Sequence, residues 1–215
     1  MTDTQKKAAV FDFDGTLIRG DSIVRFLRFA AARGALPRRE LFIIALCALG
    51  GKMGLVPMEK VKERALRFER GLTRAEKEKL CLGFAERVLV PGLLPEGKKT
   101  WENLRREGCV MALASASTSD YMEPLSRALG ADRLICTRVA EDGRVSKNCR
   151  GEEKARRVAE WAGECGVDLS RSEAFGDSAG DRFMMRLCGR AHAVNPGRRL
   201  KREAKERGWE ILYWK

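Results

Sequence analysis

The sequence predicts an α/β protein in which a parallel sheet carries helices on both faces and a helical insertion follows the first strand. Along most of the chain, short apolar runs alternate with longer helical patterns, as strands and crossover helices do in a parallel sheet. Between residues 21 and 90, apolar residues instead recur only at helical spacing. A purely helical block at this place indicates a cap over the sheet.

The first strand is expected over residues 8–13, a run rich in Val and Phe that Gly15 and Thr16 bring to an end. The cap helices are expected over residues 22–33, 38–49, 58–70 and 74–88, with prolines between them. The remaining helices are expected over 96–107, 121–129, 152–164 and 198–207, and the remaining strands over 109–114, 174–175 and 190–194. A hairpin-like excursion over 137–146 turns at Asp142 and Gly143. The predicted domains are a core over 1–18 and 92–215 and a cap over 19–91.

The composition is that of a globular chain with a basic surface. Of the 215 residues, 44% are hydrophobic, which suffices for a core. The net charge of +12 attracts anions such as phosphorylated metabolites, nucleic acid or lipid head groups. The charges occur in clusters of mixed sign, which are typical of solvated helices, so no specific nucleic acid is expected as a partner.

The cysteines and apolar runs indicate the compartment. Seven cysteines are scattered without a Cys-x-x-Cys pair, which argues against a zinc cluster or a closed disulfide framework. The longest apolar run, residues 41–51, is too short to cross a bilayer as a helix. The few residues before the first strand leave no room for a signal peptide. A cytoplasmic protein with reduced thiols is expected.

Two carboxylates, Asp12 and Asp14, stand at the end of the first predicted strand. Residues i and i+2 of a strand share a face, so the two carboxylates would repel each other unless a cation compensates them. Hard oxygen ligands suit Mg²⁺. The alternative is two surface aspartates before a Gly-Thr turn, which the apolar strand disfavours because burying an unpaired carboxylate is costly.

Three further segments carry candidate site residues. Asp177 and Asp181 follow a short apolar run; Asp177 can supply another metal oxygen, and Asp181 can fix the loop or a ligating water. Ser115 ends another predicted strand, where its hydroxyl could hold a phosphate oxygen, and Lys154 could neutralise a phosphoryl group. One of residues 117–119 is expected to cap the next helix. Taken singly, each is equally a turn residue, a helix cap or a solvated charge.

Together these residues resemble the haloacid dehalogenase superfamily, whose four motifs they match in order. Residues 12–16 look like motif one, Ser115 like motif two, Lys154 like motif three and residues 176–181 like motif four. The insertion is similar to the C1-type cap of the phosphoserine-phosphatase-like branch, and residues 194–209 are similar to the tail of its IB subfamily. The resemblance implies a Rossmann-like sheet and a Mg²⁺-dependent phosphatase.

The resemblance also implies a role for each residue. Asp12 would attack phosphorus and form an aspartyl-phosphate, while Asp14 would protonate the leaving alcohol and later deprotonate a water molecule. Asp12, Asp177 and the backbone carbonyl of Asp14 would bind Mg²⁺. Ser115 and Lys154 would hold the phosphoryl oxygens. Asp14 favours phosphoester hydrolysis, because dehalogenases lack a carboxylate two residues after the nucleophile.

The cap holds the candidates for substrate recognition. Asp21 stands where phosphoserine phosphatases carry a glutamate that contacts the substrate's ammonium, and its shorter side chain disfavours phosphoserine. Arg64 or Arg67 could meet a carboxylate or phosphate of the substrate. Residues 41–49 are apolar on every side of a helix, so they pack inside the cap or contact a lipid or an apolar substrate tail. Nearby arginines suit an anionic membrane surface.

The predicted function is hydrolysis of a phosphate monoester. Its substrate is a small phosphometabolite, such as an amino-acid phosphate, or a lipid phosphate. One alternative is a phosphotransferase that passes the aspartyl-phosphate to an acceptor alcohol. The other is a basic protein that binds nucleic acid or membranes without turnover, which predicts steeply salt-dependent binding.

Overall fold

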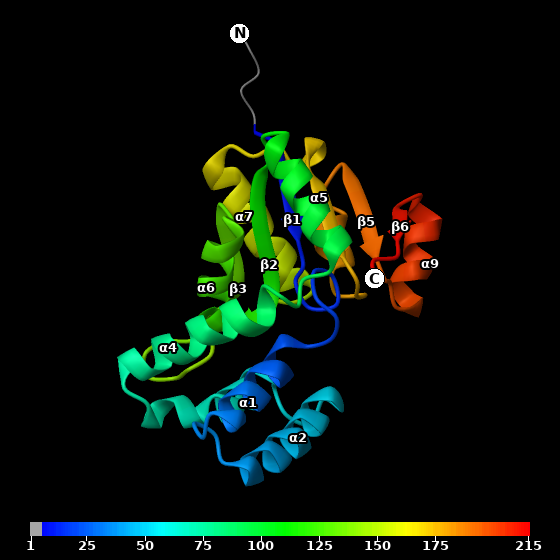
Figure 1. Ribbon diagram of the computed structural model, residues 1–215. Helices are drawn as coiled ribbons and strands as arrows, with labels where there is room; N and C mark the ends of the chain where they lie inside the picture. The colour runs from blue at the N-terminus through cyan, green and yellow to red at the C-terminus, as the bar shows by residue number, and fades with distance from the viewer. Residues whose placement is uncertain (1–5) are drawn as a thin grey trace.

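A parallel sheet forms the centre of the computed structural model, which describes residues 6–215 except for the side chain of Lys52. Residues 1–5 of the predicted core therefore lie outside the described part. The six strands follow the order β3-β2-β1-β4-β5-β6, and Figure 1 shows helices around them. Their bounds are β1 (Ala8–Phe11), β2 (Val110–Thr118), β3 (Arg133–Thr137), β4 (Glu173–Gly176), β5 (Arg190–Val194) and β6 (Glu210–Leu212). The predicted fold class is confirmed.

Strand β1 lies inside the sheet and is buried on both faces. Ala9 and Phe11 pack into one hydrophobic core and Val10 into the other, as the two-residue period of a strand requires. Phe11 stacks on Phe175 of β4, with ring centroids 4.1 Å apart. This central position places the next residue, Asp12, at the middle of the sheet's carboxyl edge.

Helices cover both faces of the sheet. Buried residues of α5 and α6 belong to the same core as Phe11, whereas those of α7, α8 and α9 belong to the core on the opposite face. The bounds are α5 (Pro95–Arg106), α6 (Ser119–Leu129), α7 (Glu152–Cys165), α8 (Arg182–Met185) and α9 (Arg198–Arg207).

The helical insertion lies beyond the carboxyl ends of the strands, below the sheet in Figure 1. Phe26 and Phe84 of the insertion pack against Tyr121 of α6, with ring centroids 5.0 and 5.4 Å from it. These contacts fix the insertion over the sheet edge that carries Asp12. Its elements are α1 (Ser22–Ala32), α2 (Arg38–Lys52), α3 (Met58–Ala65), a 3₁₀ helix (Arg67–Gly71), α4 (Arg74–Phe84) and a π-helical turn (Ala85–Leu89).

Several element boundaries differ from the predicted ones. The helix expected over 58–70 ends at Ala65, and the 3₁₀ helix that follows turns Glu69 inward to Lys77, with 2.7 Å between their charged atoms. The helix expected over 74–88 changes to π geometry after Phe84. The strand expected to end at 114 continues to Thr118. Strands β3 and β6 were not predicted.

The excursion, the cysteines and the length of the helices can be compared with what the sequence predicts. Val139 and Val145 form the antiparallel bridge of the predicted excursion, and Gly143 at its turn has a φ of 78°. All seven cysteines are free thiols. Within residues 6–215, no helix combines the length and the apolar character that crossing a membrane requires.

Candidate active site

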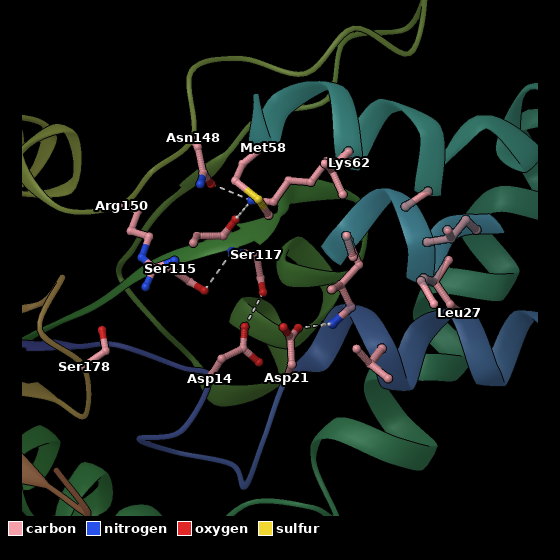
Figure 2. Close-up of a pocket in the computed structure, with 18 of the residues that line it drawn as sticks. Asp14, Asp21, Leu27, Met58, Lys62, Ser115, Ser117, Asn148, Arg150 and Ser178 are labelled. Atoms are coloured by element: carbon pink, nitrogen blue, oxygen red, sulfur yellow. Dashed lines mark hydrogen bonds between the residues drawn. The ribbon is translucent and has the colours of Figure 1, made fainter. Parts of the chain in front are cut away.

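The carboxyl ends of three strands bring the predicted site residues together. Asp12 follows β1, Ser115 lies within β2, and Asp177 follows β4. Strand β1 pairs with both β2 and β4, so segments far apart in the sequence meet at the edge where open α/β sheets bind ligands. Figure 2 shows Asp14, Ser115 and Ser178 around the resulting cavity.

Lys154 lies between two buried carboxylates. Its ammonium donates to Asp12 Oδ1 at 2.6 Å and to Asp181 Oδ1 at 2.7 Å. The exposed fractions of Asp12 and Lys154 are only 5% and 2%. The backbone N–H and hydroxyl of Ser178 donate to the other oxygen of Asp181 at 3.0 and 2.6 Å, and Thr16 donates to Asp12 Oδ2 at 3.2 Å. Asp181 therefore positions Lys154 beside Asp12.

The acidic side chains outnumber the one ammonium that lies among them. Burial, followed by the negative charge of Asp181, raises the pKa of Asp12 well above its ordinary value. The same two causes raise the pKa of Asp177 to about 7. Burial would lower the pKa of Lys154, but the charges of Asp12 and Asp181 hold it above its ordinary value. The cluster thus has more negative charge than Lys154 balances.

A divalent cation fits this excess of negative charge. Carboxylate oxygens of Asp12, Asp177 and Asp181 lie within 4.8 Å of one another, and hard cations such as Mg²⁺ prefer oxygen ligands of this kind. Gly15 leaves the room that the cluster needs: it has a φ of +84°, and a Cβ there would collide with Asp177 Oδ2. The residues present therefore suit a divalent metal between Asp12 and Asp177.

Asp14 is held by Ser22 and Ser117 and not by Lys154. Asp14 Oδ1 accepts from the backbone N–H of Ser22 at 2.6 Å, and Oδ2 accepts from the hydroxyls of Ser22, at 3.0 Å, and Ser117. Figure 2 shows the bond to Ser117. Burial raises the pKa of Asp14 to about 6, although the bonds from Ser117 and Ser22 oppose the rise. Sequence reasoning missed both serines as partners of Asp14.

The hydroxyl-rich end of β2 belongs to the site and gives the next helix no side-chain capping bond. Ser115 is buried, lines the cavity and accepts a bond from the backbone N–H of Ser117 at 3.0 Å. Thr118 is the N-cap residue of α6 but makes no side-chain capping bond. Ser119 accepts from the backbone N–H of Val139 at 3.0 Å. As expected, one of residues 117–119 occupies the N-cap position, but Thr118 does so without a side-chain bond, and Ser117 and Ser119 bond elsewhere.

A cavity of about 640 Å³ extends from the carboxylates into the insertion. Asp21 lines it and also caps α1, accepting from the backbone N–H of Ile23 at 3.1 Å. Arg64 and Arg67 do not line it. Arg64 pairs with Glu40 at 2.5 Å, and Arg67 is exposed. Neither of the two candidate arginines therefore lines the cavity: α3 turns Arg64 toward Glu40, and Arg67 lies beyond α3 in the 3₁₀ helix.

Lys62 is the cation that α3 presents to the cavity, and sequence reasoning missed it. Its ammonium donates to the carbonyl of Ala116 and to Asn148 Oδ1, both at 2.5 Å, and so joins the cap to the core. Burial lowers the pKa of Lys62 to about 8. Its spacing of four residues from Met58 and three from Ala65 was the available signal, since residues three and four apart share one side of a helix. Arg150, labelled in Figure 2, also lines the cavity.

Comparisons with known proteins agree with this site. The family described as haloacid dehalogenase-like hydrolase matches residues 9–186. The "Inhibition of morphological differentiation protein" of Streptomyces azureus is 33% identical over 216 residues, covering 96% of this chain and 78% of that protein. Phosphoserine phosphatase SerB1 of Mycobacterium tuberculosis is 32% identical over 215 residues, covering 95% and 70%. A solved protein of unknown function from Bordetella pertussis Tohama I has a TM-score of 0.85 at 26% identity, covering 97% and 99%.

The family match spans most of the chain, and both relatives are similar to it along nearly its whole length. The motifs that match lie together at the carboxyl edge of the sheet. As its motifs predicted, the chain belongs to the haloacid dehalogenase-like hydrolase family.

Proposed function

We propose that this hydrolase is a Mg²⁺-dependent phosphatase that cleaves phosphate monoesters through an aspartyl-phosphate on Asp12. The observation that carries the proposal is the buried contact of Asp12 with Lys154 beside Asp177 at the sheet edge. The relative named phosphoserine phosphatase supports the type of reaction. The substrate is a small phosphorylated molecule, in the class of amino-acid phosphates or of lipid phosphates.

The metal ligands under this proposal are the carboxylates of Asp12 and Asp177 and the backbone carbonyl of Asp14. When bound, the ion neutralises charge on the phosphoryl group. Asp181 stays bonded to Lys154 and Ser178, so it positions the site.

The first step forms the covalent intermediate. A carboxylate oxygen of Asp12 forms a bond to phosphorus while the bond from phosphorus to the leaving oxygen breaks. Asp14 gives its proton to that oxygen, so the alcohol leaves neutral. Ser22 and Ser117 support this role because they fix the Asp14 carboxyl group by hydrogen bonds.

The second step restores the enzyme. A water molecule gives a proton to Asp14 and forms a bond to phosphorus, while the bond from phosphorus to Asp12 breaks and inorganic phosphate leaves. Lys154 assists both steps, because an ammonium has three donors and only two contact Asp12 and Asp181. Ser115 and the third donor of Lys154 hold phosphoryl oxygens, and such positioning supplies most of the rate in phosphoryl transfer.

The test is the release of inorganic phosphate from p-nitrophenyl phosphate by the wild type and Asp12→Asn, with Mg²⁺ or with a chelator. We expect the substitution to lower kcat by at least about 10³-fold, since it removes the nucleophile. Asp142→Asn, in the exposed turn of the excursion, is the matched control and should keep its rate within about twofold. Equal rates for wild type and Asp12→Asn, or a rate that the chelator leaves unchanged, contradict the proposal. Transfer of the phosphoryl group to an added alcohol would support the phosphotransferase instead.

A further inference from the structure

Three helices of the insertion form the walls of the cavity above Asp12. Each contributes a stripe of residues spaced three or four apart, which is the spacing of one helix side. All three stripes border the same cavity. The apolar members include Leu27 of α1, Ile44 and Ala48 of α2, and Met58, Val61 and Ala65 of α3.

The charged groups on these walls are already hydrogen-bonded to the protein or are exposed to solvent. The Asp21 carboxylate accepts from the backbone N–H of Ile23 and caps α1. The Lys62 ammonium donates to Ala116 and Asn148. Arg28 is exposed. Away from the sheet edge, the cavity therefore offers a leaving group mainly apolar contacts.

The volume of the cavity indicates the size of the substrate that it can hold. Its 640 Å³ lies in the range that accommodates drug-sized ligands, which bury most of their surface on binding. A phosphoryl group with a short polar alcohol would occupy the sheet edge and leave the apolar walls facing water. An apolar chain along α1, α2 and α3 would instead remove these walls from water, which is favourable in proportion to the area buried.

We infer that the preferred substrate is a phosphate monoester whose alcohol carries a single extended apolar chain, bound along α1, α2 and α3. This inference rests on the proposed phosphatase function and selects the substrate class within it. The phosphate lies at Asp12 and Lys154, and the chain runs between Leu27, Ala48 and Val61.

The test is a series of monomeric alkyl phosphates, from ethyl to decyl, kept below their micelle-forming concentrations. Transfer of one methylene from water to an apolar site is worth about 0.8 kcal/mol, or about fourfold in affinity when contact is complete. We expect KM to fall at least about tenfold between butyl and octyl phosphate, with kcat changing less. Phosphoserine is included as a substrate with a short polar alcohol and should have a higher KM than octyl phosphate.

A matched pair of variants on α2 tests the position of the chain. Ala48→Trp fills the cavity beside the expected chain, whereas Leu49→Trp places the same side chain at an exposed position outside the lining. Ala48→Trp should raise KM for octyl phosphate at least about tenfold and KM for ethyl phosphate less than about threefold. Leu49→Trp should change both less than about twofold. Far-ultraviolet circular dichroism verifies that both variants fold.

The outcomes separate this inference from the proposed function. Turnover of ethyl and octyl phosphate with the same KM by the folded wild type overturns the inference and leaves the phosphatase intact. Turnover of phosphoserine with a lower KM than octyl phosphate also overturns it. If no monoester in the series, nor p-nitrophenyl phosphate, is hydrolysed, the proposed function fails and the inference fails with it.

Discussion

Lys154 and Lys62 are both nearly inaccessible to solvent, but the atoms around them differ in charge. Lys154 contacts two carboxylates, and these hold its pKa above the ordinary value in spite of burial. Lys62 contacts a carbonyl and an amide oxygen, which are neutral, and burial lowers its pKa to about 8. Lys154 thus keeps its charge, as the phosphoryl binding that we propose for it requires, whereas the pKa of Lys62 lies close to physiological pH.

Replacing Lys62 by Met should change how stability depends on pH. In the wild type, the folded protein loses the Lys62 proton near pH 8, while the unfolded chain keeps it up to the ordinary value of 10.5. The unfolded state then binds more protons, so the free energy of unfolding rises with pH in this window. Between pH 7.5 and 10, the wild type should gain about 2 kcal/mol relative to Lys62→Met.

Urea unfolding at the two pH values measures this difference. Lys60→Met is the matched control, since Lys60 lies on the same helix but is exposed. It should follow the pH dependence of the wild type. Parallel pH dependence of wild type and Lys62→Met would falsify the assignment of a lowered pKa to Lys62.

At the scale of elements, the connection from β1 to α1 carries the two aspartates to which the proposed mechanism assigns the bond-making and proton-transfer steps. It holds Asp12 and Asp14 and then turns back so that Asp21 can cap α1. Two glycines with positive φ make this course possible, Gly15 at 84° and Gly20 at 76°. Their surroundings differ: a Cβ on Gly15 would collide with Asp177, whereas nothing lies within 4 Å of the corresponding position at Gly20.

Replacing each of these two glycines by alanine should distinguish the effect of backbone strain from the effect of displacing Asp177. Both Gly15→Ala and Gly20→Ala place a side chain at positive φ, which costs about 1–2 kcal/mol of stability. Only Gly15→Ala displaces the Asp177 carboxylate from the proposed metal site. We expect similar thermal midpoints for the two variants. Phosphatase activity at saturating substrate should fall at least about 10²-fold in Gly15→Ala alone.

Activity titrated with Mg²⁺ gives a second measurement. Gly15→Ala should need a higher Mg²⁺ concentration for half its maximal rate, and Gly20→Ala should match the wild type. If the two variants lose activity equally, the contact between Gly15 and Asp177 does not explain the loss.

The predicted elements were most accurate where a strong pattern had clear boundaries. Strand β5 and helix α9 have the predicted bounds because turn residues separate them, including Asn195 with its φ of 43°. Strand β3 was missed because its run is short and begins at the exposed Arg133. Strand β6 was missed because its three residues pair only with β5. Edge strands of this length carry little periodic signal.

The site was predictable to the extent that strand ends determine it. Asp12, Ser115 and Asp177 follow or lie in neighbouring parallel strands, so topology alone brings them to one edge. Cap contacts depend on how helices rotate against one another, which periodicity does not specify. For this reason the sequence left Arg64 and Arg67 open as the cation of the cap, although α3 turns Lys62 inward.

At the scale of the whole molecule, basic charge and exposed apolar side chains occur together on the insertion. The net charge is +12. Exposed arginines precede α2, and Arg38 and Arg39 form its first turn. Helix α2 and the turn after it expose large apolar side chains, each more than half accessible: Phe42, which also lines the cavity, Leu46, Leu49, Met53 and Leu55. An anionic membrane surface complements both features, because it attracts the arginines and accepts the apolar side chains.

We therefore expect the protein to bind vesicles that contain phosphatidylglycerol and to leave vesicles of pure phosphatidylcholine unbound at low salt. Leu46→Asp should lower the bound fraction at least about fivefold, because it adds a negative charge and removes apolar area from the contact. Leu82→Asp is the matched control, since Leu82 is similarly exposed but lies on α4. Co-sedimentation at low and at about 0.5 M salt separates the electrostatic contribution from the apolar one, because salt screens the arginines but not the apolar contact. Equal binding by the two variants would place the contact elsewhere on the molecule, and absence of binding at low salt would exclude a membrane as the partner of this face.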